Sequence, residues 1–396
     1  MKIESLWLKN FKSFRDVHIK DIPSLCVIVG ANGTGKTTLF NVFGFLKDCM
    51  LYNVRQALQS RGGFREVISR GVPPGSHIEI EIKFRMDIAD VNRLVTYKIV
   101  LGEVSGRPVV VREILRYKRG AHGSPYHFLD FSYGEGYAVN NEEDFNCPDE
   151  ALKREAQKVS SDTLAISGLG QLQRFKAAHA FRDLIEEWHI SDFHINQARG
   201  SKDAVGIDDH LSVNGDNLQL VARNLYENYP GLFGEVLTRM KERVPGVSEV
   251  TPKLTEDGRL LLQFRDGAFQ DPFIDRYVSD GTIKMFAYLL LLHDPEPHPL
   301  LCVEEPENQL YPTLLWELAE EFRDYANRGG QVWVSTHSPD FLNALELDEV
   351  FWLVKKEGYT QVMRACDDPQ LSVYMQHGEK MGYLWKEGFF AGVDPR

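Results

Sequence analysis

A glycine-rich stretch near the N-terminus has the composition of a loop that binds the phosphates of a nucleotide. Residues 30–38 read GANGTGKTT and fit the pattern G-x-x-x-x-G-K-[ST] at every fixed position. They lie between an apolar run, 24–30, that predicts a buried strand and a pattern that predicts a helix. Glycines let the backbone wrap a phosphate, and the first turn of a helix offers free N–H groups and the positive end of a dipole. A plain glycine-rich turn is the alternative, which this strand–turn–helix context disfavours.

Two side chains at the end of this stretch could act on a nucleotide directly. Lys36 would bring positive charge to the β- and γ-phosphates, and the hydroxyl of Thr37 would ligate Mg²⁺. The other candidates for nucleotide binding are Gly30, Asn32, Gly33, Gly35 and Thr38. The sequence therefore predicts that the chain binds a nucleoside triphosphate together with magnesium.

Three carboxylates follow an apolar run in the last quarter of the chain. In residues 300–312, LLCVEEPENQLYP, Glu304 and Glu305 come directly after the run and Glu307 follows. A charge beside a dry core is costly unless a cation or a reacting group compensates it. We therefore assign Glu304 to the metal and Glu305 to the attacking water. A strand end whose acids are simply solvated is the alternative, and a complete phosphate loop in the same chain makes it less favoured.

Two further polar stretches stand at the ends of predicted elements. Residues 279–281, SDG, begin an apolar helical pattern whose N-terminus could also bind a phosphate. Residues 335–337, STH, end a strand pattern, where the imidazole of His337 could hydrogen-bond a γ-phosphate. The chain thus presents a phosphate loop, a polar helix start, a double-acid strand end and a histidine, in that order.

Composition and charge restrict the function classes. The 396 residues are 43% hydrophobic and 26% charged, which is ordinary for a globular protein. The net charge of −12 argues against a protein that coats nucleic acid through a general positive field, although a local basic patch stays compatible with it. The five cysteines show no C-x-x-C spacing, which favours a reduced, cytoplasmic location over a disulfide framework or zinc site. A charged N-terminus and a longest apolar run of eight residues predict neither a signal peptide nor a membrane span.

Hydrophobic periodicity predicts α/β layers divided into three parts. We expect a first ATPase lobe at 1–118, with N-terminal strands, the phosphate loop and an antiparallel sheet; a mainly helical insertion at 119–244; and completion of the core at 245–396. Within the insertion, residues 120–150 predict a loop, and the patterns at 151–166, 175–190 and 217–244 predict helices.

The ordered set of motifs resembles the ABC-type ATPases, specifically their RecF/SMC-like branch. The stretches that carry the resemblance are NFKSF (10–14), GANGTGKTT (30–38), SDG (279–281), VEEPENQLYP (303–312) and STHSP (335–339). The likeness is to compact bacterial ATPases without a coiled coil, related to the ATPase part of OLD-family proteins. It implies an α/β P-loop NTPase fold, namely an ABC-type ATPase head with an antiparallel β subdomain and a helical insertion.

The same resemblance implies an ATP held between two heads. One head would contribute the phosphate loop, the metal-binding Thr37 and Glu304, and the catalytic Glu305 and His337. The other head would contribute Ser279 and Gly281 of its signature, with residues 308–310 at the same interface. Because the chain carries one such set, complete sites require a homodimer with two ATP molecules and Mg²⁺.

This sequence departs from the family pattern in two places. Glu304 stands where an aspartate is usual, which puts the metal geometry in doubt. The signature reads SDG rather than SGG, a variant that fits the SMC-like branch better than transporters.

Several weaker signals stay open between a functional and a structural interpretation. Gln171 or Gln173 would be the glutamine that senses Mg²⁺, and Lys12 and Ser13 could reach the nucleotide; ordinary surface and a strand-end turn are the alternatives. The basic stretch 107–120 could meet nucleic acid, although a solvated strand face explains it as well. His189 and His194 are better explained as structural residues than as metal ligands, and no second metal constellation is visible in the sequence.

The resulting functional hypothesis is an ATP-hydrolysing, dimeric switch. It would sense or control a separate effector such as a nuclease, in antiphage defence or DNA repair, because the stretch after His337 is too short for a fused nuclease domain. The alternative is a RecF-like ATPase that binds DNA directly through its dimer cleft. The long insertion between Lys36 and Ser279 disfavours a transporter subunit. The presence of Glu305 and His337 disfavours a scaffold that binds ATP without hydrolysing it.

Overall fold

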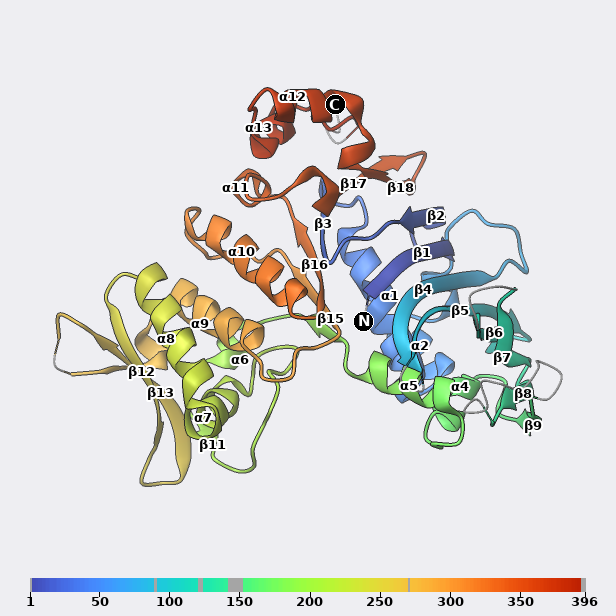
Figure 1. Ribbon diagram of the computed structural model, residues 1–396, viewed down its shortest axis with the longest axis horizontal. Coiled ribbons are helices and arrows are strands. Elements are labelled where there is room, and N and C mark those ends of the chain that lie inside the picture. Colours follow the sequence, from blue (N-terminus) through green and yellow to red (C-terminus); the bar gives the residue numbers. More distant parts are fainter. Residues whose placement is uncertain (1, 89–90, 120–123, 142–151, 270, 393–396) are drawn as a thin grey trace. The chain divides into compact units, whose positions relative to one another are not determined.

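The chain folds into two compact units (Figure 1). The structure is a computed structural model and describes residues 2–88, 91–119, 124–141, 152–269 and 271–392. The first unit comprises Met1–Trp188, Glu346–Gly378 and Glu387–Arg396, and the second comprises His189–Leu345 and Glu379–Lys386. Each unit is described by itself.

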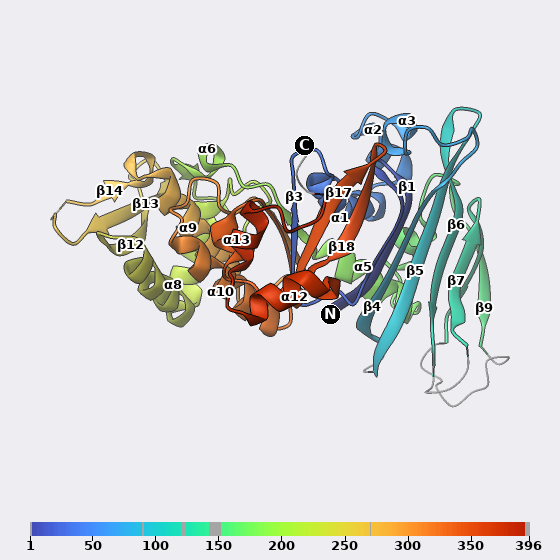
Figure 2. The same ribbon diagram turned by 90° about the horizontal axis from the view of Figure 1, so that it is seen from above.

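An antiparallel sheet of eight strands dominates the first unit, in the order β2-β1-β4-β5-β6-β7-β8-β9. Its strands are β1 (Lys2–Phe11), β2 (Phe14–Lys20), β4 (Ile78–Ile88), β5 (Val91–Val104), β6 (Arg107–Tyr117), β7 (Tyr126–Ser132), β8 (Glu135–Val139) and β9 (Arg154–Lys158). Figure 2 shows the long strands β4, β5, β6 and β7 side by side. The predicted alternation in β4 is confirmed, since every second side chain from Ile78 to Phe84 is buried. Helix α5 (Lys176–Glu186) packs on β4, where Phe181 stacks on Phe84 with ring centroids 5.0 Å apart.

The sheet extends further along the chain than the sequence indicated. Strands β7 and β8 occupy part of the expected loop at 120–150, and β9 and α4 (Ala165–Leu169) replace the expected helix at 151–166. Positions 120–123 and 142–150 of that loop lie outside the described residues. The prediction failed because β9 is a polar strand without an apolar alternation, the usual composition of a sheet edge. The boundary expected after residue 118 therefore falls inside this sheet.

A second group of strands in the first unit carries the phosphate loop. Strand β3 (Leu25–Gly30), buried along its whole length, pairs in parallel with β17 (Val350–Lys356), which pairs antiparallel with β18 (Tyr359–Arg364). The long helix α1 (Lys36–Leu51) begins six residues after the end of β3. Short helices complete the unit: α2 (Val54–Gln59), α3 (Phe64–Val67), η3 (Leu347–Glu349), η4 (Ala365–Asp367) and α12 (Pro369–Gln376).

The second unit is built on three parallel strands and a mostly buried helix. Strands β10 (His189–Ser191), β15 (Leu300–Glu304) and β16 (Gln331–Thr336) pair in that order. Helix α9 (Asp280–Leu292) is buried on all sides from residue 282 to 292, so its apolar run belongs to the core. No helix of the described chain combines the length and apolar character needed to cross a membrane.

The remaining elements of the second unit surround this core. The helices are α6 (Ile195–Ala198), α7 (Leu218–Asn228), α8 (Pro230–Arg243), η2 (Asp275–Tyr277), α10 (Leu314–Asn327), α11 (Pro339–Leu342) and α13 (Met381–Lys386). A small sheet holds β11 (Lys202–Asp203), β13 (Arg259–Asp266), β12 (Val247–Leu254) and β14 (Phe273–Ile274). The helices predicted at 175–190 and 217–244 are confirmed, as is the α/β fold with a large antiparallel sheet.

Candidate nucleotide-binding site

The predicted phosphate loop connects β3 to α1. Gly33 and Gly35 have φ angles of +80° and +108°, in the left-handed region that glycine enters readily. The first turn of α1 contains no acidic residue and has no side-chain cap. Its N–H groups and dipole therefore suit an anion. Asn32 and Thr37 are exposed and Thr38 is half-buried at this end of the helix.

The lysine of the loop folds back over its backbone. Lys36 is 7% exposed, and its Nζ donates a hydrogen bond to the main-chain oxygen of Gly30 at 2.7 Å. Thr34 Oγ1 closes the turn by donating to the oxygen of Ala31 at 2.8 Å. A Cβ at Gly30 would lie 2.5 Å from Thr34 Oγ1, so only glycine leaves this turn undisturbed. The loop is thus a compact structure with its ammonium group held close to the backbone.

Two distant residues support the loop from behind. Thr360 of β18 donates from Oγ1 to the oxygen of Thr34 at 2.6 Å and lies 2.8 Å from Ser13 Oγ. A Cβ on Gly35 would lie 2.9 Å from both of these hydroxyls. Ser13 therefore lies against the loop. The pKa of the neighbouring Lys12 is lowered by burial and by the positive charge of Arg61. The sequence had offered no signal for Thr360, because its contact spans most of the chain.

The second unit holds the carboxylates. Glu304 is the last residue of β15 and pairs with Ser335 of β16. Glu305 follows with a φ of +44°, a strained value for a residue with a side chain, and its N–H donates to the oxygen of Ser335 at 2.8 Å. Strain of this kind persists where the surrounding structure enforces it, and it is common at functional sites.

His337 lies between two of these acids. Its Nδ1 is 3.4 Å from Glu305 Oε1 and 3.5 Å from Glu307 Oε1. The side chain of Glu307 is 8% exposed, and its Oε1 accepts hydrogen bonds from Thr336 Oγ1 at 2.8 Å and from the His337 N–H at 3.0 Å. Glu307 thus fixes the end of β16 that carries His337. The sequence had shown this third acid but had given it no role.

The signature segment touches residues 308–310 within the same unit. Ser279 caps α9, with its Oγ accepting from the Thr282 N–H at 3.2 Å. A Cβ at Gly281 would lie 2.7 Å from the main-chain oxygen of Gln309, a residue with a φ of +68°. Gly281 therefore permits a close approach between the two segments that the resemblance assigned to the dimer interface.

A lysine missed by the sequence reasoning strengthens this contact. Lys284 of α9 is 5% exposed and donates from Nζ to the main-chain oxygen of Asn308 at 2.7 Å. Asn308 Nδ2 in turn donates to Glu305 Oε2 at 3.1 Å. Burial lowers the pKa of Lys284 to about 8, against the opposing effect of Glu307 and Glu305. The signature helix is thereby connected to Glu305 through one residue.

The aspartate of the signature is also held. Arg199 bonds the Asp280 carboxylate and donates to the main-chain oxygen of Arg276 at 2.9 Å. Asp275, 1% exposed, accepts from Gln219 Nε2 at 2.9 Å. These contacts fix the turn before α9 from the region 198–219.

Several predicted candidates do not join either group. Gln171 and Gln173 are exposed in the turn between α4 and α5. In the basic stretch 107–120, Arg112 forms an ion pair with Asp130, with 3.0 Å between Nη2 and Oδ2. At Arg112 the positive charge of this stretch is therefore balanced by a carboxylate of the neighbouring strand.

Each group by itself has chemistry that suits part of a magnesium–nucleotide complex. In the first unit the loop N–H groups and Lys36 suit phosphate, and Thr37 carries a hydroxyl; in the second unit Glu304 carries a carboxylate, and both offer hard oxygens of the kind that Mg²⁺ prefers. Within the described part of the chain, Ser335 Oγ and Glu307 Oε2 are buried without a hydrogen-bond partner. Buried oxygens of this kind suit the waters that a magnesium ion retains.

Two family models together span most of the chain. Residues 146–343 match the family described as "AAA domain, putative AbiEii toxin, Type IV TA system", and residues 1–158 match the "AAA ATPase domain" family. The first match covers half of the sequence. The chain belongs to this family of AAA ATPases.

Part of this AAA ATPase is similar in sequence to a RecF protein. The "DNA replication and repair protein RecF" of Heliobacterium modesticaldum (strain ATCC 51547 / Ice1) is 27% identical over 137 residues, 33% of this chain and 37% of the relative. The match thus spans little more than a third of that relative's length.

Solved structures of SMC heads share the fold. An SMC head bound to the C-terminal winged-helix domain of ScpA has a TM-score of 0.54 at 16% identity, over 92% of this chain and 97% of the other. An SMC head with an extended coiled coil, bound to the C-terminal domain of ScpA derived from Pyrococcus furiosus, has a TM-score of 0.55 at 14% identity, over 95% and 99%. The predicted family and the predicted ABC-type head fold are both confirmed.

Proposed function

We propose that this AAA ATPase binds ATP with Mg²⁺ and hydrolyses it between two copies of the chain. The observation that carries the proposal is the cluster of Glu305 and His337, positioned by the buried Glu307 and linked through Asn308 to the signature helix. A lone solvated acid would need neither a strained backbone nor this set of hydrogen bonds.

Each group has a distinct task in the proposed reaction. Lys36 and the N–H groups of α1 would bind the phosphates, and Thr37 and Glu304 would hold Mg²⁺; such an ion supplies charge neutralisation when bound. Glu305 orients and polarises the attacking water, and His337 donates to the γ-phosphate. Glu304 is one methylene longer than aspartate and would still offer a carboxylate to the metal.

The signature supplies the switch. Ser279 and Gly281 of a second copy would complete the site, so that ATP favours the closed dimer and hydrolysis releases it. The coupling between α9 and Glu305 supports this proposal, because closure that moves the signature would also move the carboxylate in the same unit. The switch would sense or control a separate effector protein, such as a nuclease, in phage defence or DNA repair.

Direct binding of DNA is the second candidate. The printed name of the RecF relative, a DNA replication and repair protein, favours it. The net charge of −12 and the ion pair of Arg112 weigh against a broad DNA-binding face. Salt-sensitive, ATP-dependent binding of a duplex by the purified chain would support this candidate, and ATP-dependent dimerisation without DNA binding would leave the effector hypothesis in place.

The decisive experiment compares ATP turnover of the wild type and Glu305→Gln, with the molar mass followed by light scattering with and without ATP. We expect Glu305→Gln to lose at least about 100-fold in turnover, in the range of a missing general base, and to accumulate as an ATP-dependent dimer. Glu256→Gln, an exposed acid of the β12–β13 hairpin, is the matched control and should behave as wild type. Equal turnover in Glu305→Gln and wild type would refute the role of Glu305.

A further inference from the structure

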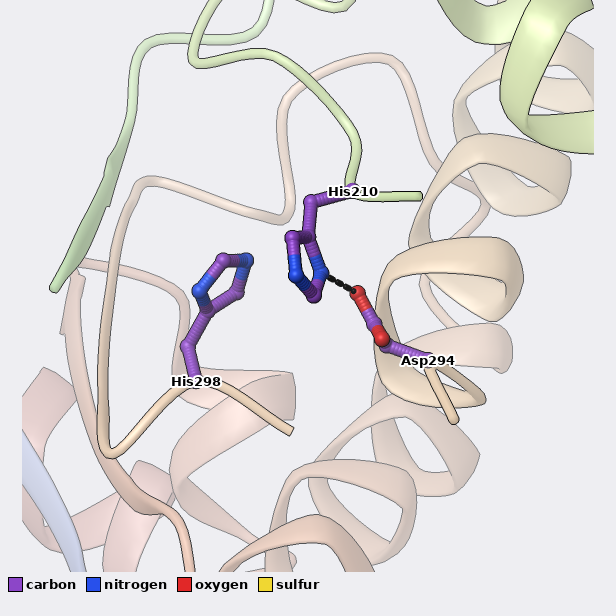
Figure 3. A group of neighbouring side chains, drawn as sticks. All are labelled: His210, Asp294 and His298. Carbon is purple, nitrogen blue, oxygen red and sulfur yellow. Dashed lines mark hydrogen bonds and ion pairs between the residues drawn. The ribbon is translucent and has the colours of Figure 1, made fainter. Parts of the chain in front are cut away.

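A cluster of two histidines and an aspartate lies in the second unit, apart from every residue assigned to the nucleotide. Figure 3 shows His210, Asp294 and His298 with the imidazole rings and the carboxylate turned toward one another. One ligand atom from each residue lies within 4.8 Å of the other two. From this geometry we propose that His210, Asp294 and His298 bind a divalent transition-metal ion of the zinc type.

The three side chains have the chemistry of such a site. Two neutral imidazoles and one carboxylate are a common ligand set for zinc and related ions, whereas magnesium prefers oxygen ligands alone. Metal–ligand bonds of about 2.1 Å place tetrahedral ligand atoms roughly 3.4 Å apart, so a movement of about 1 Å per side chain would close the site. The side chain of His210 is 42% exposed, which gives its ring room to turn and gives an ion a route of entry.

The charge balance also favours a cation here. The side chain of Asp294 is 3% exposed, and its Oδ2 accepts from His210 Nδ1 at 2.7 Å. A buried carboxylate normally has a cationic partner or a metal, and a histidine provides a charge only when it is protonated. A bound divalent ion would compensate Asp294 at neutral pH, with two uncharged imidazoles completing the ligand set.

The surroundings hold the ligands in place. Asp294 Oδ1 accepts from the Glu296 N–H at 2.9 Å, and Asn217 Nδ2 donates to the main-chain oxygen of His210 at 2.9 Å. The ring of His298 stacks on His189 of β10, with centroids 4.9 Å apart and planes inclined by 25°. Outer contacts of this kind orient metal ligands and raise their affinity. The sequence had shown no second metal constellation, because His210 lies far along the chain from the other two residues. His189, expected to be structural, packs against the ring of His298.

The position of the cluster suggests what the ion would do. Asp294 and His298 lie in the connection between α9, which begins at the signature, and β15, which ends at Glu304. His210 lies in the segment between β11 and α7. An ion would therefore fasten that segment to the connection between the two elements that carry the signature and the carboxylates. It acts as a structural clamp, and its binding does not depend on the proposed ATP reaction.

The test uses the full chain, free of affinity tags and stripped of metal, in buffer without nucleotide. Isothermal titration with Zn²⁺ should give one site per chain, and excess Mg²⁺ should not compete for it. His210→Ala, at an exposed position that should tolerate the change, should weaken Zn²⁺ binding at least about 100-fold, and Asp294→Asn should weaken it too. His194→Ala is the matched control, since His194 is also exposed in this unit and lies 3.4 Å from the carboxylate of Asp192.

A second measurement distinguishes a structural metal site from nonspecific binding of an ion at the surface. Zn²⁺ should raise the unfolding temperature of wild type and His194→Ala, and leave that of His210→Ala unchanged, because only an ion bound to the folded site stabilises it. Absence of stoichiometric Zn²⁺ binding to the wild type would overturn the proposal. Equal binding by His210→Ala would overturn it as well, and would assign the ion to other side chains such as the half-buried Cys366.

Discussion

The ammonium group of Lys284 donates a hydrogen bond to the main-chain oxygen of Asn308 at 2.7 Å, and the side chain of Asn308 donates to Glu305 at 3.1 Å. A buried charge on the signature helix is thus one residue away from the carboxylate proposed to polarise water. Because both bonds lie within one unit, any force on the first turns of α9 is transmitted to Glu305 through a short, packed path. This path would give the proposed switch a physical means of coupling closure to hydrolysis.

Replacing Lys284 with methionine should therefore uncouple the signature helix α9 from Glu305. The substitution keeps the apolar stem but leaves the Asn308 oxygen without its donor, at a cost of about 1–3 kcal/mol to the arrangement of the site. We expect kcat for ATP to fall about tenfold while KM changes less than about twofold, because Lys284 would not touch the nucleotide. Steady-state kinetics checks this, with Lys241→Met, an exposed lysine of α8, as the control. An unchanged kcat in Lys284→Met would contradict the coupling.

A second prediction concerns the glycine of the signature. A Cβ at position 281 would lie 2.7 Å from the Gln309 oxygen, a backbone atom that cannot rotate away. Gly281→Ala should therefore destabilise the chain by about 1–3 kcal/mol through overpacking. Gly234→Ala, within α8 and with nothing within 4 Å of the added carbon, should instead stabilise it by about 0.5–1 kcal/mol. Denaturant unfolding of both variants measures the difference, and the same sign for both would show that the close approach to Gln309 is not the cause.

Local patterns in the sequence were sufficient for the parts of the site that are continuous along the chain. The phosphate loop, the strand ending at Glu304 and the helix beginning at Asp280 each lie where strand and helix periodicity predicted them. Those signals depend only on neighbours a few residues apart.

The residues that were missed act across long separations. The contact of Thr360 with Thr34 and Ser13 depends on the pairing of β18 with β17, and the contact of His210 with Asp294 joins segments 84 residues apart. Neither residue stands in a motif. The prediction missed the polar strand β9 for a different reason. Its position depends on backbone pairing with β8, and its sequence has no apolar alternation.

The hydroxyl of Thr360 gives a third prediction, for the first unit. Thr360→Val keeps the volume and removes the hydrogen bonds to the oxygen of Thr34 and to Ser13. Each such bond contributes about 1 kcal/mol, so a loosened loop should bind ATP roughly fivefold to tenfold more weakly. Titration with a fluorescent ATP analogue measures this affinity. Thr238→Val, whose hydroxyl bonds only its own helix at the Gly234 oxygen, is the control and should bind as wild type does; an equal loss in both variants would rule out a specific effect of Thr360.

The last prediction concerns Glu113, a fully buried acid of β6. Burial raises its pKa to about 7, although Tyr97 Oη at 2.9 Å and the N–H of Ala165 at 2.6 Å donate to the carboxylate and oppose the shift. Because the folded state binds this proton more tightly than the unfolded state, the stability that it contributes is complete below about pH 4.5 and is lost as the pH rises through about 7.

Glu113→Gln removes this titration and keeps the size of the side chain. As the pH rises from 5.5 to 8, the wild type should therefore lose about 2 kcal/mol of unfolding free energy relative to Glu113→Gln. Denaturant unfolding at the two pH values measures it, and Glu256→Gln, exposed in the β12–β13 hairpin, should show no such shift. A pH-independent difference between wild type and Glu113→Gln would mean that the carboxylate stays charged throughout this range, held by its three donors rather than governed by its burial.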